Sequence, residues 1–265
     1  MKKTFISLSL IIILALILPI ISNKLIEQQI SKKIELLNSN GIEVKNTFSE
    51  SSYISTTKYY KCTLKDTNKA IKFMQTFVNQ NILLLSDKEL EGMVIVIEMK
   101  YSNIPIGDSM SIDIYPLLLP TNLTDKISKE NPRFYKFITK TLDKKTIFYH
   151  INSNLLEAKF NGYMKNINES YTLDNGREIR VIIDDFSFNG EGMIASHKQL
   201  NTKIKNITFT IVEPYEKIVL SLKDLYSQSS FKLNGSLYAK DMGESLLFEI
   251  NKKNSSININ GKKVK

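Results

Sequence analysis

Apolar and polar residues alternate along most of the C-terminal half of this chain, and this alternation limits the fold more than any other feature. It is clearest in three stretches, Ile179/Val181/Ile183, Ile207/Phe209/Ile211 and Ile218/Leu220/Leu222. A period of two places the apolar residues on one face of a strand and the polar residues on the other, as in antiparallel sheets. Residues 146–265 are therefore predicted to form an almost entirely β, curved antiparallel meander sheet.

The boundaries of these strands can be read from the same pattern. The expected strands are Thr146–Ile151, Leu155–Ile167, Arg177–Phe188, Lys203–Val212, Lys217–Lys223, Ser230–Leu233, Leu246–Asn251 and Ser255–Ile259. Asp174-Asn175-Gly176 predicts a tight turn between two of them. A motif of an apolar residue, Asn and Gly recurs at Phe160–Gly162, Phe188–Gly190, Leu233–Gly235 and Ile259–Gly261. Because Asn and Gly tolerate positive φ, the motif predicts a turn or bulge at the end of successive strands.

The N-terminal half mixes strands with about three helices, so the fold class is α+β and β-rich. Its expected strands are Ile42–Lys45, Tyr53–Leu64, Met93–Tyr101 and Met110–Tyr115, the last stopped by Pro116 because proline cannot continue a central strand. One helix should be capped by Asp66 or Thr67 and run to about Asn79, and Ser86 with Glu89 forms a capping box for a short turn. Asn131-Pro132 has the cap-then-proline order that opens a helix reaching Lys145.

The stretch Phe5–Ser22 is uncharged and apolar, and Lys2 and Lys3 precede it. Its length, about 27 Å as a helix, approaches the ~30 Å hydrocarbon core of a bilayer. We expect an uncleaved anchor over residues 1–22, a helical stalk over 23–40 and an α+β domain over 41–265. The alternative is a cleaved secretory signal, which the absence of a small-residue cleavage site disfavours. The predicted location is the inner membrane, single-pass, with a cytoplasmic N-terminus and a periplasmic body.

The charge balance is basic, with 36 Lys and Arg against 27 Asp and Glu, or +9 overall. Scattered charge of this kind is typical of a solvated surface, and near a membrane it also attracts anionic headgroups. Membrane lipids are therefore expected as partners of the N-terminal helix, with a lipid or an envelope protein as a further ligand. The chain has no arginine-rich or RNP-like run, which argues against a nucleic-acid partner.

No motif for catalysis, cofactor binding or metal binding stands out in the sequence. Cys62 is the only cysteine, so no intramolecular disulfide forms, and we expect an inert, partly buried thiol; His150 and His197 are the only histidines. Asp184-Asp185, with Glu178 and Glu191 near, is the most acidic cluster, but neighbours on a strand point to opposite faces. Phe186 and Phe188 share a face and are expected in the core. We therefore assign no catalytic, cofactor or metal residue and expect a protein that is not an enzyme.

Several short segments resemble the YdgA-like family of bacterial envelope proteins of unknown function. They are Gly41-Ile-Glu-Val-Lys45, Ser51-Ser-Tyr-Ile-Ser-Thr56, Phe160-Asn-Gly-Tyr-Met-Lys-Asn-Ile167 and Phe186-Ser-Phe-Asn-Gly190. The family is similar in plan, with an N-terminal membrane anchor followed by a β-rich periplasmic domain. Because it has no established catalytic residues, the resemblance implies a location and an architecture but no site.

Three hypotheses for function follow. The first is a non-enzymatic envelope protein that presents an apolar face of a curved sheet to lipid or to another envelope component. The second is a structural or adaptor domain with a protein partner and no lipid site. The third is a hydrolase whose site carries no recognisable motif. A curved C-terminal sheet with an open apolar face would favour the first.

Overall fold

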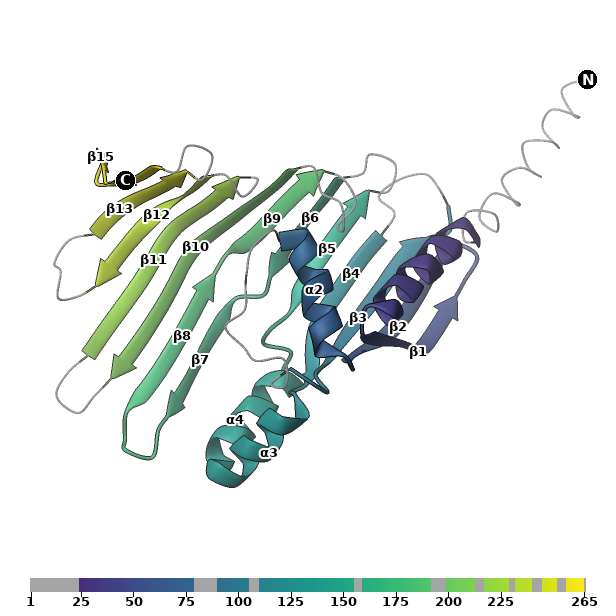
Figure 1. Ribbon diagram of the computed structural model, residues 1–265, viewed down its shortest axis with the longest axis horizontal. Helices are drawn as coiled ribbons and strands as arrows, with labels where there is room; N and C mark the ends of the chain where they lie inside the picture. Colours follow the sequence, from purple (N-terminus) through teal and green to yellow (C-terminus); the bar gives the residue numbers. More distant parts are fainter. Residues whose placement is uncertain are drawn as a thin grey trace, which may run out of the picture. The chain divides into compact units, whose positions relative to one another are not determined.

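The protein is a mostly antiparallel β-sheet with four helices in the described part of the chain (Figure 1). The computed structural model describes residues 24–78, 90–104, 110–154, 159–191, 199–212, 217–228, 232–239, 245–251 and 256–264. Strands make up 58% of the described residues, far above the roughly 20–25% of an ordinary globular domain. The chain divides into two compact units, Met1–Lys126 with Asn152–Glu157, and Ile127–Ile151 with Ala158–Lys265.

The structure contradicts the transmembrane helix that the sequence predicted. Among the described residues, no helix combines the length and the apolar character needed to cross a membrane. The helix over residues 24–39 includes Lys24, Glu27, Lys32 and Lys33, and charges are costly in a bilayer core. Phe5–Ser22, on which the anchor and the single-pass inner-membrane location were predicted, lies outside the described residues. The predicted single-pass inner-membrane location is corrected together with the helix.

The first unit contains a four-stranded antiparallel meander and the helices beside it. Its strands are β1 (Ile42–Ser51), β2 (Ser55–Leu64), β3 (Val94–Ser102) and β4 (Met110–Leu118), and each pairs with the next. Ile26, Ile30, Ile34 and Leu37 are, together with Glu27, the less exposed residues of helix 24–39. Glu27 of this helix forms an ion pair of 2.8 Å with Lys58 on β2.

Helix α2 (Thr67–Val78) begins as its sequence predicts. The carboxylate of Asp66 accepts a hydrogen bond of 3.1 Å from the backbone N–H of Lys69, so Asp66 is the cap. This bond to the ionised form lowers the pKa of Asp66. Ala70 and Ile71 are buried and join the core of the first unit. The predicted turn at Ser86 and Glu89 lies outside the described residues.

Strand β4 differs from its prediction, because it continues through Pro116 to Leu118. The pairing shifts register at this point: Ile95 lies opposite Pro116, whereas Val94 lies opposite Leu118. The irregularity accommodates a residue that has no N–H to donate to the ladder. Helix α3 (Thr121–Glu130) follows and was not predicted.

The second unit is a longer antiparallel sheet with helix α4 (Pro132–Asp143). Its strands are β6 (Lys159–Met164), β7 (Ile167–Thr172), β8 (Glu178–Asp184), β9 (Phe186–Glu191), β10 (Gln199–Val212), β11 (Lys217–Gln228), β12 (Lys232–Ala239), β13 (Ser245–Asn251), β14 (Ser256–Ile259) and β15 (Lys262–Lys263). β5 (Tyr149–Asn154) extends across the division between the units. From β10 to β15 each strand pairs with the next, while β8 and β9 both pair with β10. The predicted turn at Asp174–Gly176 joins β7 to β8, and Gly176 has a φ of 81°.

The alternation of apolar residues changes phase along a line that crosses this sheet. In β8 they occupy odd positions up to Ile183, and in β9 they occupy even positions from Phe186. The same change occurs in β11 between Leu222 and Leu225. Asp185 and Asp224, which lie at these points, both have a φ of 51°, in the left-handed region. A residue in this conformation interrupts the pleat of the strand. After it, side chains continue to alternate, but odd and even positions have exchanged faces.

The reassignment keeps the apolar side chains on one side of the sheet. Leu222 and Leu246 both lie opposite Leu237 of β12, so the three share a face. Gly235, two residues before Leu237 in β12, is on that face too. A Cβ atom built on Gly235 would lie 2.6 Å from Leu225 Cδ2, which places Leu225 on this face as well. The two left-handed residues therefore let one face remain apolar over the whole length of the strands.

The recurring apolar–Asn–Gly motif does not mark strand ends in three of its four occurrences. Gly162, Gly190 and Gly235 lie within β6, β9 and β12, and only Asn260-Gly261 forms a turn with positive φ, of 48° and 77°. A Cβ atom at Gly162 would lie 2.5 Å from the Phe188 ring and 2.4 Å from the backbone oxygen of His150. At Gly162 and Gly235, glycine thus makes room for large neighbouring side chains rather than for a turn.

The break in β11 gives a direct prediction for stability. Replacing Asp224 by valine forces a β-branched residue into the left-handed region and should lower the free energy of unfolding by about 1–2 kcal/mol. Asp224→Asn should change it by less than about 0.5 kcal/mol, because asparagine tolerates this conformation. Chemical denaturation followed by circular dichroism measures both. The matched control is Lys223→Val at the preceding exposed strand position, and equal stability of the two valine variants would contradict the account.

Candidate functional site

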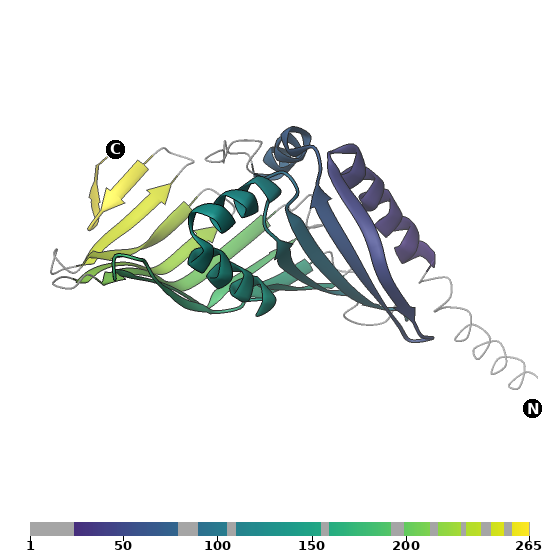
Figure 2. The ribbon, with the colours of Figure 1, turned by 90° about the horizontal axis from the view of Figure 1, so that it is seen from below.

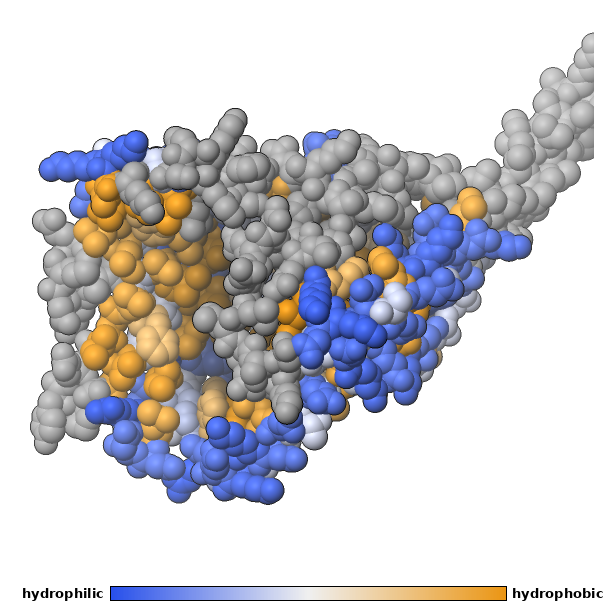
Figure 3. Space-filling view, viewed as in Figure 1, coloured by the Kyte–Doolittle hydropathy of each residue, from blue (hydrophilic) through white to orange (hydrophobic). Residues whose placement is uncertain are grey.

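One side of the second unit presents a set of side chains that we call the apolar face. Paired residues of neighbouring strands point the same way, so the members follow from the strand register. The apolar face consists of Ile179, Val181 and Ile183 on β8, Ile207, Phe209 and Ile211 on β10, Ile218, Leu220 and Leu222 on β11, Leu237 on β12, Leu246, Phe248 and Ile250 on β13, and Ile257 and Ile259 on β14. Hydrophobic residues gather over these C-terminal strands in the space-filling view (Figure 3).

The centre of the apolar face is open to solvent. Phe209 is 37% exposed, Ile218 41% and Leu220 43%, although they belong to two neighbouring strands inside the sheet. Ile250 and Ile259, toward the C-terminal strands, are also exposed. Large contiguous apolar patches on a protein surface commonly mark sites of interaction. This face therefore has the composition of a binding surface rather than that of ordinary solvated sheet.

The opposite side of the same strands, which we call the outer face, is polar at the sheet centre. Thr208 and Ser221 share a hydrogen bond of 2.9 Å between their hydroxyls, and Asn206 donates to the Asp184 carboxylate at 3.1 Å. Ser221 and Thr210 are buried. The hydroxyl and amide groups on this side are thus satisfied within the sheet, and the exposed aliphatic surface at the centre lies on the other side.

The sheet of the second unit curves, and the apolar face is on its concave side. Seen from below, the strands from β10 to β14 rise toward the side on which α4 lies (Figure 2). The same side carries the hydrophobic surface of Figure 3. A curved surface can contact a narrow apolar molecule along more than one side.

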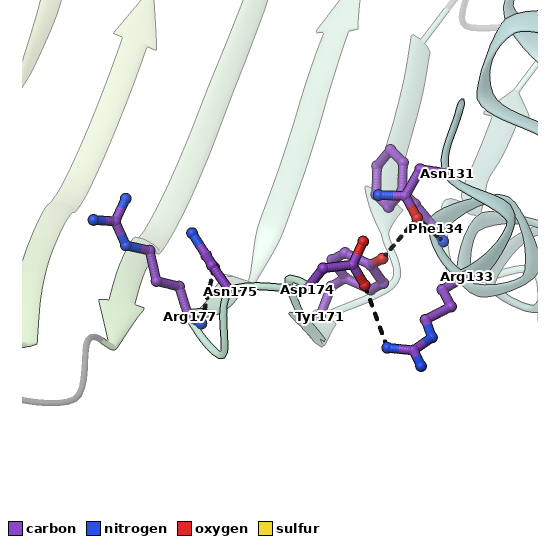
Figure 4. A network of polar contacts seen from close by, with 7 residues as sticks. All are labelled: Asn131, Arg133, Phe134, Tyr171, Asp174, Asn175 and Arg177. Atoms are coloured by element: carbon purple, nitrogen blue, oxygen red, sulfur yellow. Dashed lines mark hydrogen bonds and ion pairs between the residues drawn. The ribbon is translucent and has the colours of Figure 1, made fainter.

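Helix α4 is fixed at the β7 edge of this face. Phe134 and Phe137 contact the Tyr171 ring, at centroid distances of 5.0 and 5.2 Å, and Tyr171 lies opposite Ile179 in the pairing. The side chain of Asn131 accepts hydrogen bonds from the backbone N–H of Phe134 at 2.9 Å and from the Tyr171 hydroxyl at 3.2 Å (Figure 4). The predicted cap and proline at the start of this helix are confirmed. Asn131 thus joins the start of the helix to the sheet.

The turn between β7 and β8 holds the same helix by an ion pair. Arg133 Nη1 lies 3.3 Å from Asp174 Oδ1, and both side chains are largely exposed (Figure 4). An exposed pair of this kind contributes little stability, but it shows which flank of α4 faces the turn.

Positive charge is concentrated in the second unit. This unit contains 22 Lys and Arg against 14 Asp and Glu, which gives +8, whereas the first contains 14 against 13, which gives +1. By contrast, the described side chains of the apolar face carry no charge, and Glu169 of β7, opposite Val181 at its edge, accepts a hydrogen bond of 3.1 Å from Thr146. The sequence alone showed only a basic chain, because the division into units was not known.

The acidic residues singled out in the sequence do not form one site. Asp184 accepts the hydrogen bond from Asn206, while Asp185 forms an ion pair of 3.4 Å with Lys205. Glu178 and Glu191 lie at opposite ends of the β8–β9 segment. Within the described ranges, no group of three or more His, Cys, Asp or Glu residues is placed to hold a metal ion.

Cys62 lies in the core of the first unit. It is 5% exposed on β2, and burial raises the pKa of its thiol to about 11. Burial likewise raises the pKa of the nearby Tyr60 and Tyr101 to about 12. His150 packs against Tyr163 with a centroid distance of 5.2 Å, and His197 lies outside the described residues.

Phe186 and Phe188 pack within an aromatic group beyond the line of left-handed residues. Their rings lie 6.0 Å apart, and Phe188 also contacts Phe160 at 6.4 Å. Phe160 is buried, while Phe186 and Phe188 are half-buried. This part of the sheet is more closely packed than the centre of the apolar face.

Comparison with known proteins identifies no relative of this chain. No family model, no curated protein and no solved structure matches it. The resemblance to the YdgA-like family therefore stays a prediction, and the functional argument depends on the geometry described above.

The raised pKa of Cys62 predicts low reactivity. At pH 8 the native thiol should be almost fully protonated, with about a hundredfold less thiolate than an ordinary cysteine of pKa near 9. Alkylation by iodoacetamide, followed by mass spectrometry, should be at least about 50-fold slower in the native protein than in guanidinium. Equal rates in the two conditions would show that the thiol is accessible.

The hydrogen bonds that Asn131 accepts at the start of α4 predict that removing its side chain destabilises the protein. Asn131→Ala removes the acceptor at the start of α4 and should lower the free energy of unfolding by about 1 kcal/mol. Asn131→Asp keeps an acceptor for the Phe134 N–H and should remain within about 0.5 kcal/mol of the parent protein. Denaturant titration distinguishes the two, and an alanine variant as stable as the aspartate variant would exclude this role.

Proposed function

We propose that the second unit binds the hydrocarbon chain of an amphiphile on its apolar face. The observation that supports this most directly is the exposure of Phe209, Ile218 and Leu220 at the centre of a concave, uncharged surface. Removing such side chains from water is favourable by about 25 cal/mol for each Å² of apolar surface. The first hypothesis from the sequence was an envelope protein whose curved sheet presents an apolar face to lipid or to another envelope component. The present proposal keeps the lipid ligand and makes no claim about a membrane location.

The chemistry of the face favours a hydrocarbon chain over a protein partner. Its described side chains are aliphatic apart from Phe209 and Phe248, and they carry no hydroxyl, amide or charged group. Protein interfaces usually obtain their affinity from Tyr, Trp and Arg residues and from about one hydrogen bond per 100–200 Å². A methylene chain needs neither, because it offers only apolar surface.

The length of the chain can be bounded by its energy. Burial contributes about 0.8 kcal/mol per methylene, so twelve buried methylenes contribute about 10 kcal/mol. Association costs at least about 4 kcal/mol in lost freedom of motion. The difference, about 6 kcal/mol, corresponds to a Kd on the order of tens of micromolar. Chains of about 12–16 carbons are therefore the appropriate probes.

Photo-crosslinking tests this proposal on the full chain. The probe is a lysophosphatidylcholine whose 16-carbon chain carries a diazirine, and labelled peptides are located by mass spectrometry. Labelling should fall within β10 and β11. The variant Leu220→Lys places a charge on the apolar face and should reduce that labelling at least about fivefold.

The matched control is Leu247→Lys. Leu247 is 60% exposed on β13, and it lies opposite Ser236 on the outer face. The control should be labelled like the parent protein. Circular dichroism verifies folding, and Phe209→Gln replaces Leu220→Lys should the latter fail to fold. Equal labelling of the apolar-face and control variants, or labelling confined to other strands, would exclude the proposal.

The adaptor and hydrolase hypotheses make different predictions in the same samples. A second copy of the chain on the apolar face would produce a dimer in light scattering that Leu220→Lys dissociates and added lysophospholipid does not. That result would replace the proposed ligand by a protein partner. No geometry described above favours a hydrolase, and the expectation that the protein is not an enzyme stays a prediction.

A further inference from the structure

We infer that the amphiphile carries an anionic headgroup, and that this headgroup lies against the basic flank of α4, defined as Arg133, Lys136 and Lys140. The inference rests on the proposed function, since it concerns the headgroup of the same ligand. It is supported by the position of α4 on the sheet, by the arrangement of charge on this helix and by the division of charge between the units.

The position of α4 places this flank beside the apolar face. The helix is attached through Phe134 and Phe137 to Tyr171, which continues the row of Ile179, Ile211 and Ile218 at one end of the apolar face. A ligand chain that lies across the strands along this row, from Ile218 through Ile211 to Ile179, therefore ends at the β7 edge, where α4 is attached.

The basic residues share one flank of the helix. At about 100° per residue, Arg133, Lys136 and Lys140 all fall within about 100° of Phe137 and on the same side of it. The ion pair between Arg133 and Asp174 directs this flank toward the turn. Lys136 and Lys140 are exposed, and neither forms an ion pair with any residue that the structure describes. Their ammonium groups are thus available to an anion at this end of the strands.

The distribution of charge between the two units also favours a negatively charged ligand. The second unit carries +8 of the total +9, although the proposed chain-binding surface is uncharged. Three acidic residues lie near this flank: Asp143 at its end, Asp174, which forms the ion pair with Arg133, and Glu169, which lies opposite Val181 and accepts a hydrogen bond from Thr146. Lys136 and Lys140 are the charges of the flank that an anionic headgroup would meet. A lysine close to an anionic lipid surface increases affinity about fivefold, since it contributes ~1 kcal/mol. An anionic headgroup would therefore be preferred to a zwitterionic one, and salt would weaken the preference.

Competition against the diazirine probe tests the inference. Unlabelled lysophosphatidylglycerol and lysophosphatidylcholine, each with a 16-carbon chain, are compared at low ionic strength on the full chain. The anionic lipid should compete at about tenfold lower concentration in the parent protein. In Lys136→Gln/Lys140→Gln the difference should fall below about twofold, while lysophosphatidylcholine should compete as before.

The control variant is Lys203→Gln/Lys223→Gln, which removes the same charge elsewhere in the second unit. Both residues are exposed, and Lys223 lies opposite Asn206 on the outer face. This variant should keep most of the tenfold preference. Equal competition by the two lipids in the parent protein would overturn the inference while leaving the proposed function intact, and so would a preference that survives in Lys136→Gln/Lys140→Gln. Absence of probe labelling in the parent protein would instead overturn the proposed function.

Discussion

The constraint on which this structure depends is the alternation of side chains between the two faces of a strand. An apolar residue can remain on one side of a long, bent sheet only where the backbone leaves the regular pleat at the right position. In β11 and between β8 and β9 this occurs at Asp224 and Asp185, each in the left-handed region. Aspartate is among the few residues besides glycine that adopt this conformation without a large penalty. These two residues lie on either side of β10, and they let apolar side chains stay on one side of the sheet both before and after the break.

The second determinant is the attachment of α4. Asn131 satisfies the start of the helix and the Tyr171 hydroxyl together, while Phe134 and Phe137 contribute the apolar contact. The helix thereby carries basic side chains to the edge of an uncharged surface. Hydrocarbon chain and anionic headgroup need opposite environments, and in the second unit these environments are adjacent. This adjacency, rather than any single residue, is why an amphiphile suits the site better than a purely apolar molecule.

The sequence predicted local features well and long-range features poorly. Asp66, Asn131-Pro132 and Asp174–Gly176 each act through neighbours in the chain, and their cap and turn geometries were found as expected. The Phe160–Gly162 motif was misread, because the reason for its glycine is the ring of Phe188, which is distant in sequence. The change of phase at Asp185 was missed for the same reason, since periodicity describes each strand without relating its faces to those of the next. Whether Leu220 is exposed likewise depends on which elements cover the sheet, and the sequence of one strand does not contain that information.

The most direct test of the account is where a bound chain lies. A crystal structure of the full chain with a lysophosphatidylglycerol brominated near the end of its acyl chain would locate the bromine by anomalous scattering. The account predicts a bromine peak in contact with Phe209 or Leu220 and a headgroup near Lys136 and Lys140. A peak on the outer face near Leu247, or no peak on the protein at saturating lipid, would contradict it.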